Sequence, residues 1–144
     1  MKTVADILKV RVHSSIISVT PATTVLEAVA LMSDTDISAL MVLDGAEVAG
    51  IITERDFVRR VARMERSSYA ISVGDVMTRN LITVSPLDST RVCMQLMIEK
   101  NLRHLPVLDD GKLVGLLSIR DLVKDVIAEQ DGLINHLEQY IRGE

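Results

Sequence analysis

The chain repeats itself: shifted by 65 residues, it matches its own sequence without a gap from residue 17 to residue 123. Roughly a third of the paired positions are identical, and most others exchange one aliphatic side chain for another, as expected of a repeated structural unit. The identical pairs include Pro21 with Pro86, Asp44 with Asp109, Gly50 with Gly115, and Asp56 with Asp121. The sequence therefore predicts two copies of one module. Because two similar units tend to bury their faces against each other, we expect a cleft whose halves carry the same polar groups.

Composition limits the classes of protein that such a repeat can build. Hydrophobic residues make up 48% of the 144 residues but aromatic residues only 2%. The core is therefore expected to be aliphatic, and aromatic platforms that stack single-stranded nucleic acid are not expected. The net charge of −4 argues against a nucleic-acid or acidic-membrane partner, because those partners require a basic surface.

The sequence lacks the signals of secretion, membrane insertion and cysteine chemistry. Asp6 lies where a signal peptide has its apolar run, and no stretch of about 18 apolar residues occurs, so a cytoplasmic protein is predicted. The single cysteine, Cys93, is expected to be a small buried hydrophobe without a disulfide or a thiolate metal site. His13 and His136 have no partner at metal-ligand spacing, and no metal site is predicted.

Each copy is predicted to fold as β-α-β-β-α, which makes the chain an α+β protein of two tandem repeats. The elements expected in the first copy are a strand at 16–19, a helix capped by Thr23 or Thr24, strands at 39–43 and 48–52 that form a hairpin, and a helix at 54–64. The elements expected in the second copy are a strand at 81–84, a helix at 89–100, strands at 104–108 and 112–117, and a helix at 119–129.

The expected domain division follows from these repeats. Short helices at 4–8 and 73–77 precede the two copies, and polar residues from 65 to 72 form the expected linker. We therefore assign 1–66 to the first repeat with its N-terminal helix and 67–130 to the second repeat. A last amphipathic helix over 131–144 opens at Asp131-Gly132 and is expected to pack across a subunit interface.

The sharpest polar element of the repeat lies where its last strand meets its last helix. Thr53 ends an apolar strand and Asp56 follows three residues later; Ser118 and Asp121 repeat this arrangement. A hydroxyl followed by a carboxylate at this spacing is typical of a helix cap. The same arrangement also suits a ligand, because the N–H groups of a helix N-terminus attract a phosphate and a fixed carboxylate can accept from two ribose hydroxyls.

These motifs resemble those of cystathionine-β-synthase (CBS) domains. The resemblance is carried by the strand-(Thr/Ser)-x-x-Asp pattern, the proline that ends the first strand, and the segment Asn101-Leu102-Arg103-His104-Leu105-Pro106-Val107. It extends from Asp6 to about Asp125, and the tail 133–141 is similar to that of stand-alone prokaryotic CBS-pair proteins. The resemblance implies a tandem pair, called a Bateman module, that binds AMP, ATP, NAD or S-adenosylmethionine between its repeats and commonly forms a homodimer.

The resemblance also implies a set of ligand-binding residues. Asp56 and Asp121 would bind the ribose hydroxyls, and Thr53 and Ser118 phosphate or ribose oxygens. The adenine would lie against two short strands that offer backbone groups, Ile17-Ser18-Val19 and Ile82-Thr83-Val84. Arg55 and Arg120, which precede the aspartates, complete the motif.

The two expected sites differ in charge. Arg103 and His104 would face the phosphates, whereas Ser38 and Ala39 occupy the equivalent positions of the first copy. The sequence does not show which site gains the charge; because the resemblance implies that this dipeptide serves both sites, we rank the Ser118/Asp121 site first and the Thr53/Asp56 site second. His104 could equally be a satisfied residue at the boundary of the core.

Three functions remain to be compared. The favoured one is a regulatory nucleotide sensor, acting without turnover on an unidentified partner protein. An enzyme is not expected, because neither a Ser-His-Asp set nor a His/Cys cage is present at workable spacing. The third is a nucleic-acid binder or a structural dimerisation module that uses the stripe formed by Arg55, Arg59, Arg63 and Arg66, although a solvated helix face explains this stripe as well.

Overall fold

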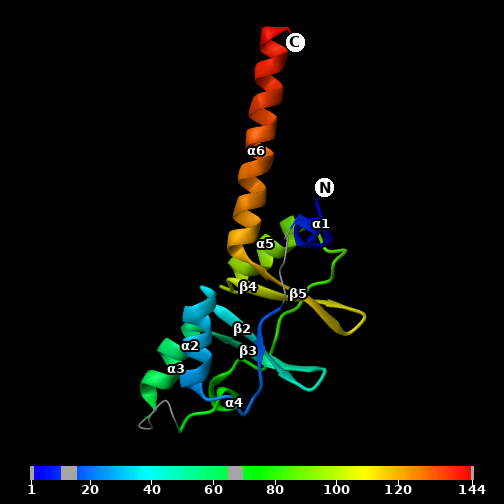
Figure 1. Ribbon diagram of the computed structural model, residues 1–144. Helices are drawn as coiled ribbons and strands as arrows, with labels where there is room; N and C mark the ends of the chain where they lie inside the picture. Colours follow the sequence, from blue (N-terminus) through cyan, green and yellow to red (C-terminus); the bar gives the residue numbers. More distant parts are fainter. Residues whose placement is uncertain (1, 11–15, 65–69, 144) are drawn as a thin grey trace. The chain divides into compact units, whose positions relative to one another are not determined.

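The computed structural model describes residues 2–10, 16–64 and 70–143 (Figure 1). These residues form two compact α+β units. The repeat-1 unit contains the described residues from 16 to 82, and the repeat-2 unit contains residues 2–10 together with residues 83–143. The predicted α+β class with two tandem repeats is confirmed.

The repeat-1 unit is built on a three-stranded sheet. Its order is β1-β2-β3, with β1 parallel to β2 and β2 antiparallel to β3. The elements are β1 Ser18–Val19, α2 Val25–Thr35, β2 Ala39–Asp44, β3 Glu47–Thr53, α3 Glu54–Arg60, the 3-10 turn η1 Val61–Arg63, and α4 Val73–Val76. Figure 1 shows α2 and α3 side by side next to the β2–β3 hairpin.

Helical periodicity and strand sequence together produce the core of this unit. Val25, Ala28 and Met32 of α2 recur at helical spacing and are buried, and they belong to one hydrophobic cluster with Leu40 of β2 and Ile52 of β3. The α2 helix begins at a capping box, in which the Thr24 hydroxyl accepts from the N–H of residue 27. It ends where the next residue, at 36, takes a left-handed conformation.

The repeat-2 unit has the same plan on a smaller sheet. Its elements are α1 Val4–Val10, α5 Thr90–Glu99, β4 His104–Asp109, β5 Lys112–Ser118 and α6 Ile119–Arg142. Local irregularities recur at the repeat offset: the register shifts between Val42 and Leu43 and again between Val107 and Leu108. Asn101 likewise repeats the positive φ of 54° found at position 36.

The segment before each repeat packs against the other repeat. The backbone of residues 2–5 pairs with residues 86–90, through Val4 N–H to the Asp88 carbonyl and Ala5 N–H to the Pro86 carbonyl, both 2.9 Å. In the same way, Val73 N–H donates to the Thr23 carbonyl at 2.8 Å. We call residues 2–10 and 70–78 the N-strap and the middle strap. The compact units therefore divide the chain differently from the 1–66, 67–130 and 131–144 division, because backbone pairing places each strap with the sister repeat.

Several predicted boundaries need correction. The strand expected at 81–84 is reduced to a single bridge between Val84 and Val107. The helix expected at 54–64 changes to a 3-10 turn after Arg60. No break occurs at residues 131–132, because α6 continues from Ile119 to Arg142 as one helix of 24 residues. A helix that is already packed at its base can continue through one glycine at a cost of only about 1 kcal/mol.

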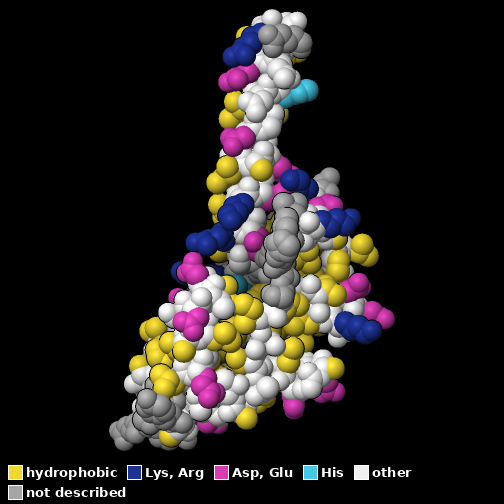
Figure 2. All heavy atoms as spheres, in the orientation of Figure 1, with side chains coloured by type: hydrophobic (Ala, Val, Ile, Leu, Met, Phe, Trp, Pro, Cys, Tyr) yellow, Lys and Arg dark blue, Asp and Glu magenta, His cyan; other side chains and the backbone are white. Residues whose placement is uncertain are grey.

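The second half of α6 extends beyond the rest of its unit. Every residue from 127 to 143 is exposed, and Figure 2 shows hydrophobic side chains on the surface of this helix. Even so, among the helices that the structure describes, none combines the length and apolarity that crossing a bilayer requires.

Candidate functional site

The Thr53/Asp56 motif forms a complete capping box at the start of α3. The Thr53 N–H and hydroxyl donate to Asp56 Oδ2 at 3.0 and 3.2 Å, and the Asp56 N–H donates to Thr53 Oγ1 at 3.1 Å. The motif fixes both side chains because an extended Thr53 ends β3 and a helical turn begins at the next residue. The predicted cap is therefore confirmed here.

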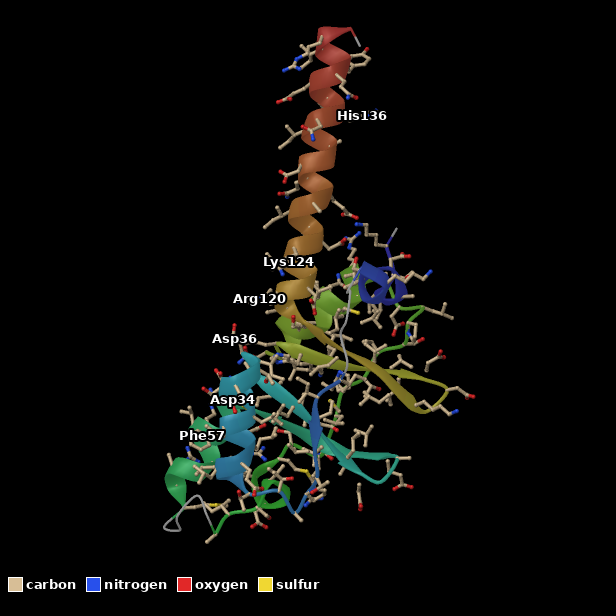
Figure 3. All side chains as sticks on the ribbon, in the orientation of Figure 1. Asp34, Asp36, Phe57, Arg120, Lys124 and His136 are labelled. Atoms are coloured by element: carbon tan, nitrogen blue, oxygen red, sulfur yellow. The ribbon has the colours of Figure 1, made fainter. Side chains whose placement is uncertain are left out.

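The Ser118/Asp121 motif builds the same box at the start of α6. The Ser118 N–H and hydroxyl donate to Asp121 Oδ2, both at 2.8 Å, and the Asp121 N–H donates to Ser118 Oγ at 3.2 Å. Each box places a carboxylate on the first turn of a helix, beside backbone N–H groups that can bind an anion. Figure 3 places Arg120 and Lys124 on the same end of α6, where their positive charges can add to this effect.

The two aspartates differ in burial. Asp56 is buried, with 8% of its surface exposed, and its second oxygen accepts from the Thr78 hydroxyl at 3.0 Å. Arg60 Nε also approaches that oxygen to 3.8 Å. Asp121 is only partly buried. Asp56 is therefore held on both carboxylate oxygens by its own unit, which lowers its capacity to bind a ligand.

Thr78 was missed in the sequence because no local pattern marks it. It lies 22 residues after Asp56 and reaches that carboxylate only because the middle strap pairs with β3, where Ile51 and Thr78 exchange backbone hydrogen bonds of 3.0 and 2.8 Å. Only the packing of the strap brings the two side chains together.

The dipeptide at 103–104 and its counterpart at 38–39 adjoin the boxes. The Arg103 carbonyl accepts from the N–H of residue 119 at 2.8 Å, and the Ser38 carbonyl accepts from Glu54 N–H at 3.0 Å. In the hairpin registers, His104 lies opposite Ser118 and Ala39 opposite Thr53. Within each unit, backbone pairing therefore places the dipeptide next to the box.

His104, which pairs with Ser118 in this register, carries a titratable side chain. Burial lowers its pKa from the usual value of 6.5, and the positive charge of Arg103 lowers it further, while the negative charge of Asp121 acts in the opposite direction. Arg103 itself is exposed. The dipeptide next to the repeat-2 box therefore carries a cation, whereas the dipeptide next to the first box is the neutral pair Ser38-Ala39.

The residues expected to contact an adenine are placed on short, partly paired segments. Ser18 and Val19 pair with β2, and Ile17 and Ile82 are half-buried. The Val84 N–H donates to the Pro106 carbonyl at 3.0 Å, and its carbonyl accepts from Leu108 at 2.9 Å. Because β4 uses both backbone groups of Val84, only its neighbours, such as the exposed Thr83, could offer theirs to a ligand.

The arginine stripe is not a uniform cationic face. Arg60, next to the stripe, donates from Nη1 to the Val76 and Met77 carbonyls, both at 2.9 Å, and so ties α3 to the middle strap. Arg59 and Arg63 are exposed, but α3 ends before Arg63, and Arg66 lies outside the described residues. The regular helical face that the sequence predicted is therefore interrupted.

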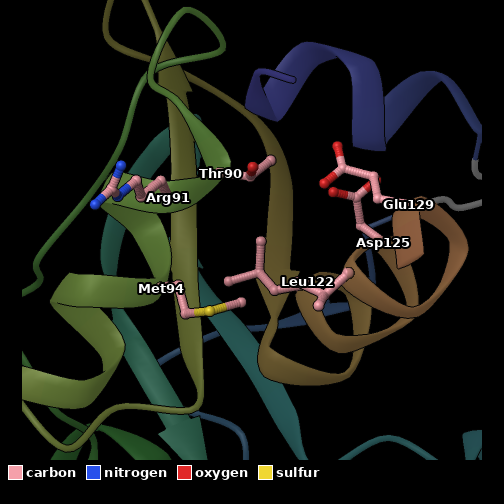
Figure 4. Close-up of a pocket in the computed structure, with 7 residues that line it drawn as sticks. Thr90, Arg91, Met94, Leu122, Asp125 and Glu129 are labelled. Carbon is pink, nitrogen blue, oxygen red and sulfur yellow. The ribbon is translucent and has the colours of Figure 1, made fainter. Parts of the chain in front are cut away.

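A pocket of about 190 Å³ lies between α5 and α6 (Figure 4). Its lining includes the apolar side chains of Met94, Leu122 and Val126 and the carboxylates of Asp125 and Glu129. Lys2 of the N-strap donates to Asp125 Oδ1 at 2.7 Å. The sequence analysis did not predict this pocket. Within the described ranges, no group of three or more His, Cys, Asp or Glu side chains is placed to hold a metal ion.

Comparison with known proteins gives relatives over almost the entire chain. The mitochondrial CBS domain-containing protein CBSX3 of Arabidopsis thaliana is 38% identical over 98% of this chain and 72% of its own length. A solved structure of a protein with CBS domains from Burkholderia ambifaria MC40-6 is 52% identical, with a TM-score of 0.86 over 90% of this chain and 96% of that one.

Two more distant structures share the fold and contain adenosyl ligands. CBSX2, 24% identical with a TM-score of 0.76 over 89% of this chain and 98% of that one, was solved in complex with AMP. The CBS domain pair of MJ0100, 23% identical with a TM-score of 0.77 over 90% and 98%, was solved with 5′-methylthioadenosine and S-adenosyl-L-methionine.

The family model for the CBS domain matches the chain twice, over residues 4–63 and 73–128. These ranges contain both strand-end boxes and most of each strap. The chain therefore belongs to the CBS domain family and carries two tandem copies of its domain.

Proposed function

We propose that this chain is a regulatory module that binds an adenosyl nucleotide and does not convert it. The observation that carries the proposal is the repeated box that fixes an aspartate and a hydroxyl at a helix N-terminus. Such a box can accept hydrogen bonds from a sugar and donate backbone hydrogen bonds to a phosphate. The AMP and S-adenosylmethionine complexes of CBSX2 and MJ0100 support this class of ligand.

The Ser118/Asp121 box is the preferred site. Asp121 is more exposed than Asp56, and the carboxylate of Asp56 already receives hydrogen bonds on both oxygens from its own unit. Asp121 would bind the ribose hydroxyls, Ser118 a ribose or phosphate oxygen, and Ile82, Thr83 and Val84 would contact the adenine. The Thr53/Asp56 box, with Ile17, Ser18 and Val19, would bind more weakly.

The charge next to the preferred box favours a ligand with phosphates. Arg103 is exposed and follows the helix α5 by four residues, on the segment that is tied to the α6 N-terminus. A cation attracts the phosphates of AMP, ATP or NAD and repels the sulfonium of S-adenosylmethionine. AMP, ATP and NAD are therefore the proposed ligands.

Regulation requires that the nucleotide bind two states of the protein with different affinity, because a ligand shifts an equilibrium only by that difference. We propose that a partner protein senses the resulting change. The cytoplasm remains the predicted location. The relative CBSX3 is mitochondrial by name, so mitochondria are the second compartment in which to search for the partner.

Calorimetric titration with AMP, ATP, NAD and S-adenosylmethionine tests this function. Asp121→Ala should weaken nucleotide binding by about one to two decades, since a hydrogen bond to a charged group contributes about 1.5–3 kcal/mol. Glu27→Ala is the matched control, because Glu27 completes the equivalent box of α2 without belonging to the proposed site. Equal losses in both variants, or no binding by the wild type, would contradict the proposal.

A turnover assay separates a sensor from an enzyme. Purified protein incubated with each nucleotide should yield no product by liquid chromatography, because the proposed site supplies hydrogen bonds and a cation but no activated nucleophile. Steady product formation that disappears in Asp121→Ala would assign an enzyme to the same site.

A further inference from the structure

The pocket between α5 and α6 combines apolar side chains with two carboxylates that the proposed nucleotide site does not use (Figure 4). Asp125 and Glu129 lie four residues apart and therefore one helical turn apart on α6. The side chains of Met94 and Val126 also line the pocket. Its volume of about 190 Å³ is below the roughly 300–1,000 Å³ of pockets for drug-sized ligands. The pocket therefore suits a ligand the size of one amino-acid side chain rather than a nucleotide.

The Asp125 carboxylate is buried but only half used. Its side chain is 10% exposed, whereas the side chain of its ion partner Lys2 is 44% exposed. Lys2 Nζ donates to Asp125 Oδ1 at 2.7 Å, and among the residues that the structure describes no group donates to Oδ2. Because a buried charge is costly unless it is paired and hydrogen-bonded, this second oxygen is suited to bind a further cation.

Glu129 adds a second negative charge to the pocket. It is exposed, and within the described ranges no basic side chain forms an ion pair with it. The hydrogen bond to Asp125 raises the pKa of Lys2 above its usual 10.5, and the charges of Asp125 and Glu129 raise it further, while burial acts in the opposite direction. Arg91 also lines the pocket, but Figure 4 shows its guanidinium pointing away from both carboxylates. Lys2 therefore compensates one of the two negative charges, and one remains for a ligand.

The repeated fold does not require this acidic pair. In the first copy, the positions equivalent to Asp125 and Glu129 are occupied by Arg60 and Met64. Neither carboxylate lies in the first turn of α6, which begins at Ile119, so capping of the helix does not explain them. The two carboxylates are thus a feature of the repeat-2 unit alone.

We propose that this pocket binds a primary alkyl ammonium, the chemistry of a lysine side chain or of a free alkyl amine. The ammonium would bind Asp125 Oδ2 and the Glu129 carboxylate, and the aliphatic chain would contact Met94 and Val126. Lys2 makes the same kind of contact within the chain, since its ammonium binds the other oxygen of Asp125. A lysine side chain suits such a pocket because its aliphatic stem packs on apolar surface while its charged end stays with polar groups.

Methyl NMR of the full chain, isotope-labelled at its methionine methyl groups, tests the site directly at Met94. The probe is Nα-acetyl-lysine methylamide, and its norleucine analogue lacks the ammonium. The lysine derivative should shift the Met94 signal with a Kd of the order of millimolar, as expected for a ligand of few atoms. The signal of Met32, in the core of the repeat-1 unit, should not move. The norleucine analogue should bind about tenfold more weakly or less, because it makes no charge-assisted hydrogen bond. Equal binding of both probes, or no shift of Met94, overturns the proposal.

Charge variants test the role of the carboxylates in the same titration. Glu129→Gln should weaken binding of the lysine derivative by about threefold or more, because it removes one of the two negative charges. Lys2→Ala should tighten binding by about two- to fivefold, the range of an exposed ion pair, because it removes the competing ammonium. Glu138→Gln, at an exposed position of the same helix outside the pocket, is the matched control and should change nothing. Binding that is unaffected by Glu129→Gln or weakened by Lys2→Ala overturns the proposal.

A titration with n-butylamine distinguishes the two sources of the ammonium. Tighter binding of the lysine derivative would assign the pocket to a protein side chain, and equal binding would assign it to a free alkyl amine; both results support the ammonium site. None of these measurements uses a nucleotide, so their outcome is separate from that of the proposed sensing function.

Discussion

At the scale of single residues, the two aspartates of the repeat have different roles. Asp56 links three elements, since it caps α3 and accepts from Thr78 on the middle strap. Asp121 caps α6 and is more exposed. The sequence alone assigns both aspartates the same role. The structure indicates that Asp56 mainly stabilises its unit, and we propose that Asp121 binds a ligand.

This difference predicts unequal losses of stability. Asp56→Ala should lower the free energy of unfolding by about 3 kcal/mol, because it leaves the partly buried hydroxyls of Thr53 and Thr78 without their acceptor. Asp121→Ala should cost about 1 kcal/mol, the usual value of a lost cap. Urea unfolding measures both values, and equal losses would show that the contact with Thr78 contributes nothing.

His104 predicts a pH dependence of stability. Its pKa in the folded chain is lowered from 6.5, chiefly by burial, so the unfolded chain takes up a proton at a higher pH than the folded chain does. The associated stability is complete above pH 6.5 and is lost as the pH falls towards the lowered value. His104→Ala, which copies the residue at position 39, should therefore lose less stability than the wild type between pH 7.5 and pH 5.5. An equal or larger loss in urea unfolding would contradict this account.

At the scale of elements, the straps explain why a glycine recurs in the last strand of each hairpin. A Cβ atom on Gly50 would lie 2.6 Å from the Thr78 carbonyl oxygen, and one on Gly115 would lie 2.9 Å from Leu8 Cδ2. The first neighbour is backbone held by two hydrogen bonds to Ile51, whereas the second is the end of a flexible side chain. Close approach of a strap therefore requires glycine more strictly at position 50.

Alanine substitution should separate these two glycines. Gly50→Ala is expected to lower the free energy of unfolding by about 3 kcal/mol, near the upper end for overpacking, and Gly115→Ala by about 1 kcal/mol because Leu8 can move. Thermal unfolding of both variants provides the comparison. If Gly115→Ala proves the more damaging, the N-strap is held more tightly than its side-chain contact implies.

The elements also show how far the sequence could predict the structure. The sequence predicted both hairpins and the boxes at 53–56 and 118–121, because apolar strand runs, the turns between them and helix caps are local signals. The sequence did not predict that a 3-10 turn follows α3 after Arg60. At this point Arg60 donates to two carbonyls of the middle strap, and a contact between such distant segments leaves no local signal. Nor did the sequence predict the continuous α6, since Gly132 suggested a break that the helix propensity of its neighbours overrides.

At the scale of the whole molecule, the fold depends on how the two straps connect the repeats as well as on the repeats themselves. Each strap precedes one repeat in the chain and pairs with the other, so neither repeat is complete when the chain is divided at residue 66. The residues that pair through their backbones lie at least 27 residues apart in the sequence, as Ile51 and Thr78 do, which is why local patterns could not reveal them. The helix α1 of the N-strap contacts β5 and α6, the two elements that meet at the Ser118/Asp121 box.

The central claim is that a fixed carboxylate at the start of α6 recognises the hydroxyls of a ribose. Calorimetric titration of the wild type and Asp121→Ala with AMP and 2′-deoxy-AMP tests it most directly. The wild type should bind AMP about tenfold or more tightly than the deoxynucleotide, the value of one charge-assisted hydrogen bond, and Asp121→Ala should bind both with equal, weaker affinity. A wild type that does not distinguish the two nucleotides, or a preference that persists in Asp121→Ala, would contradict the account.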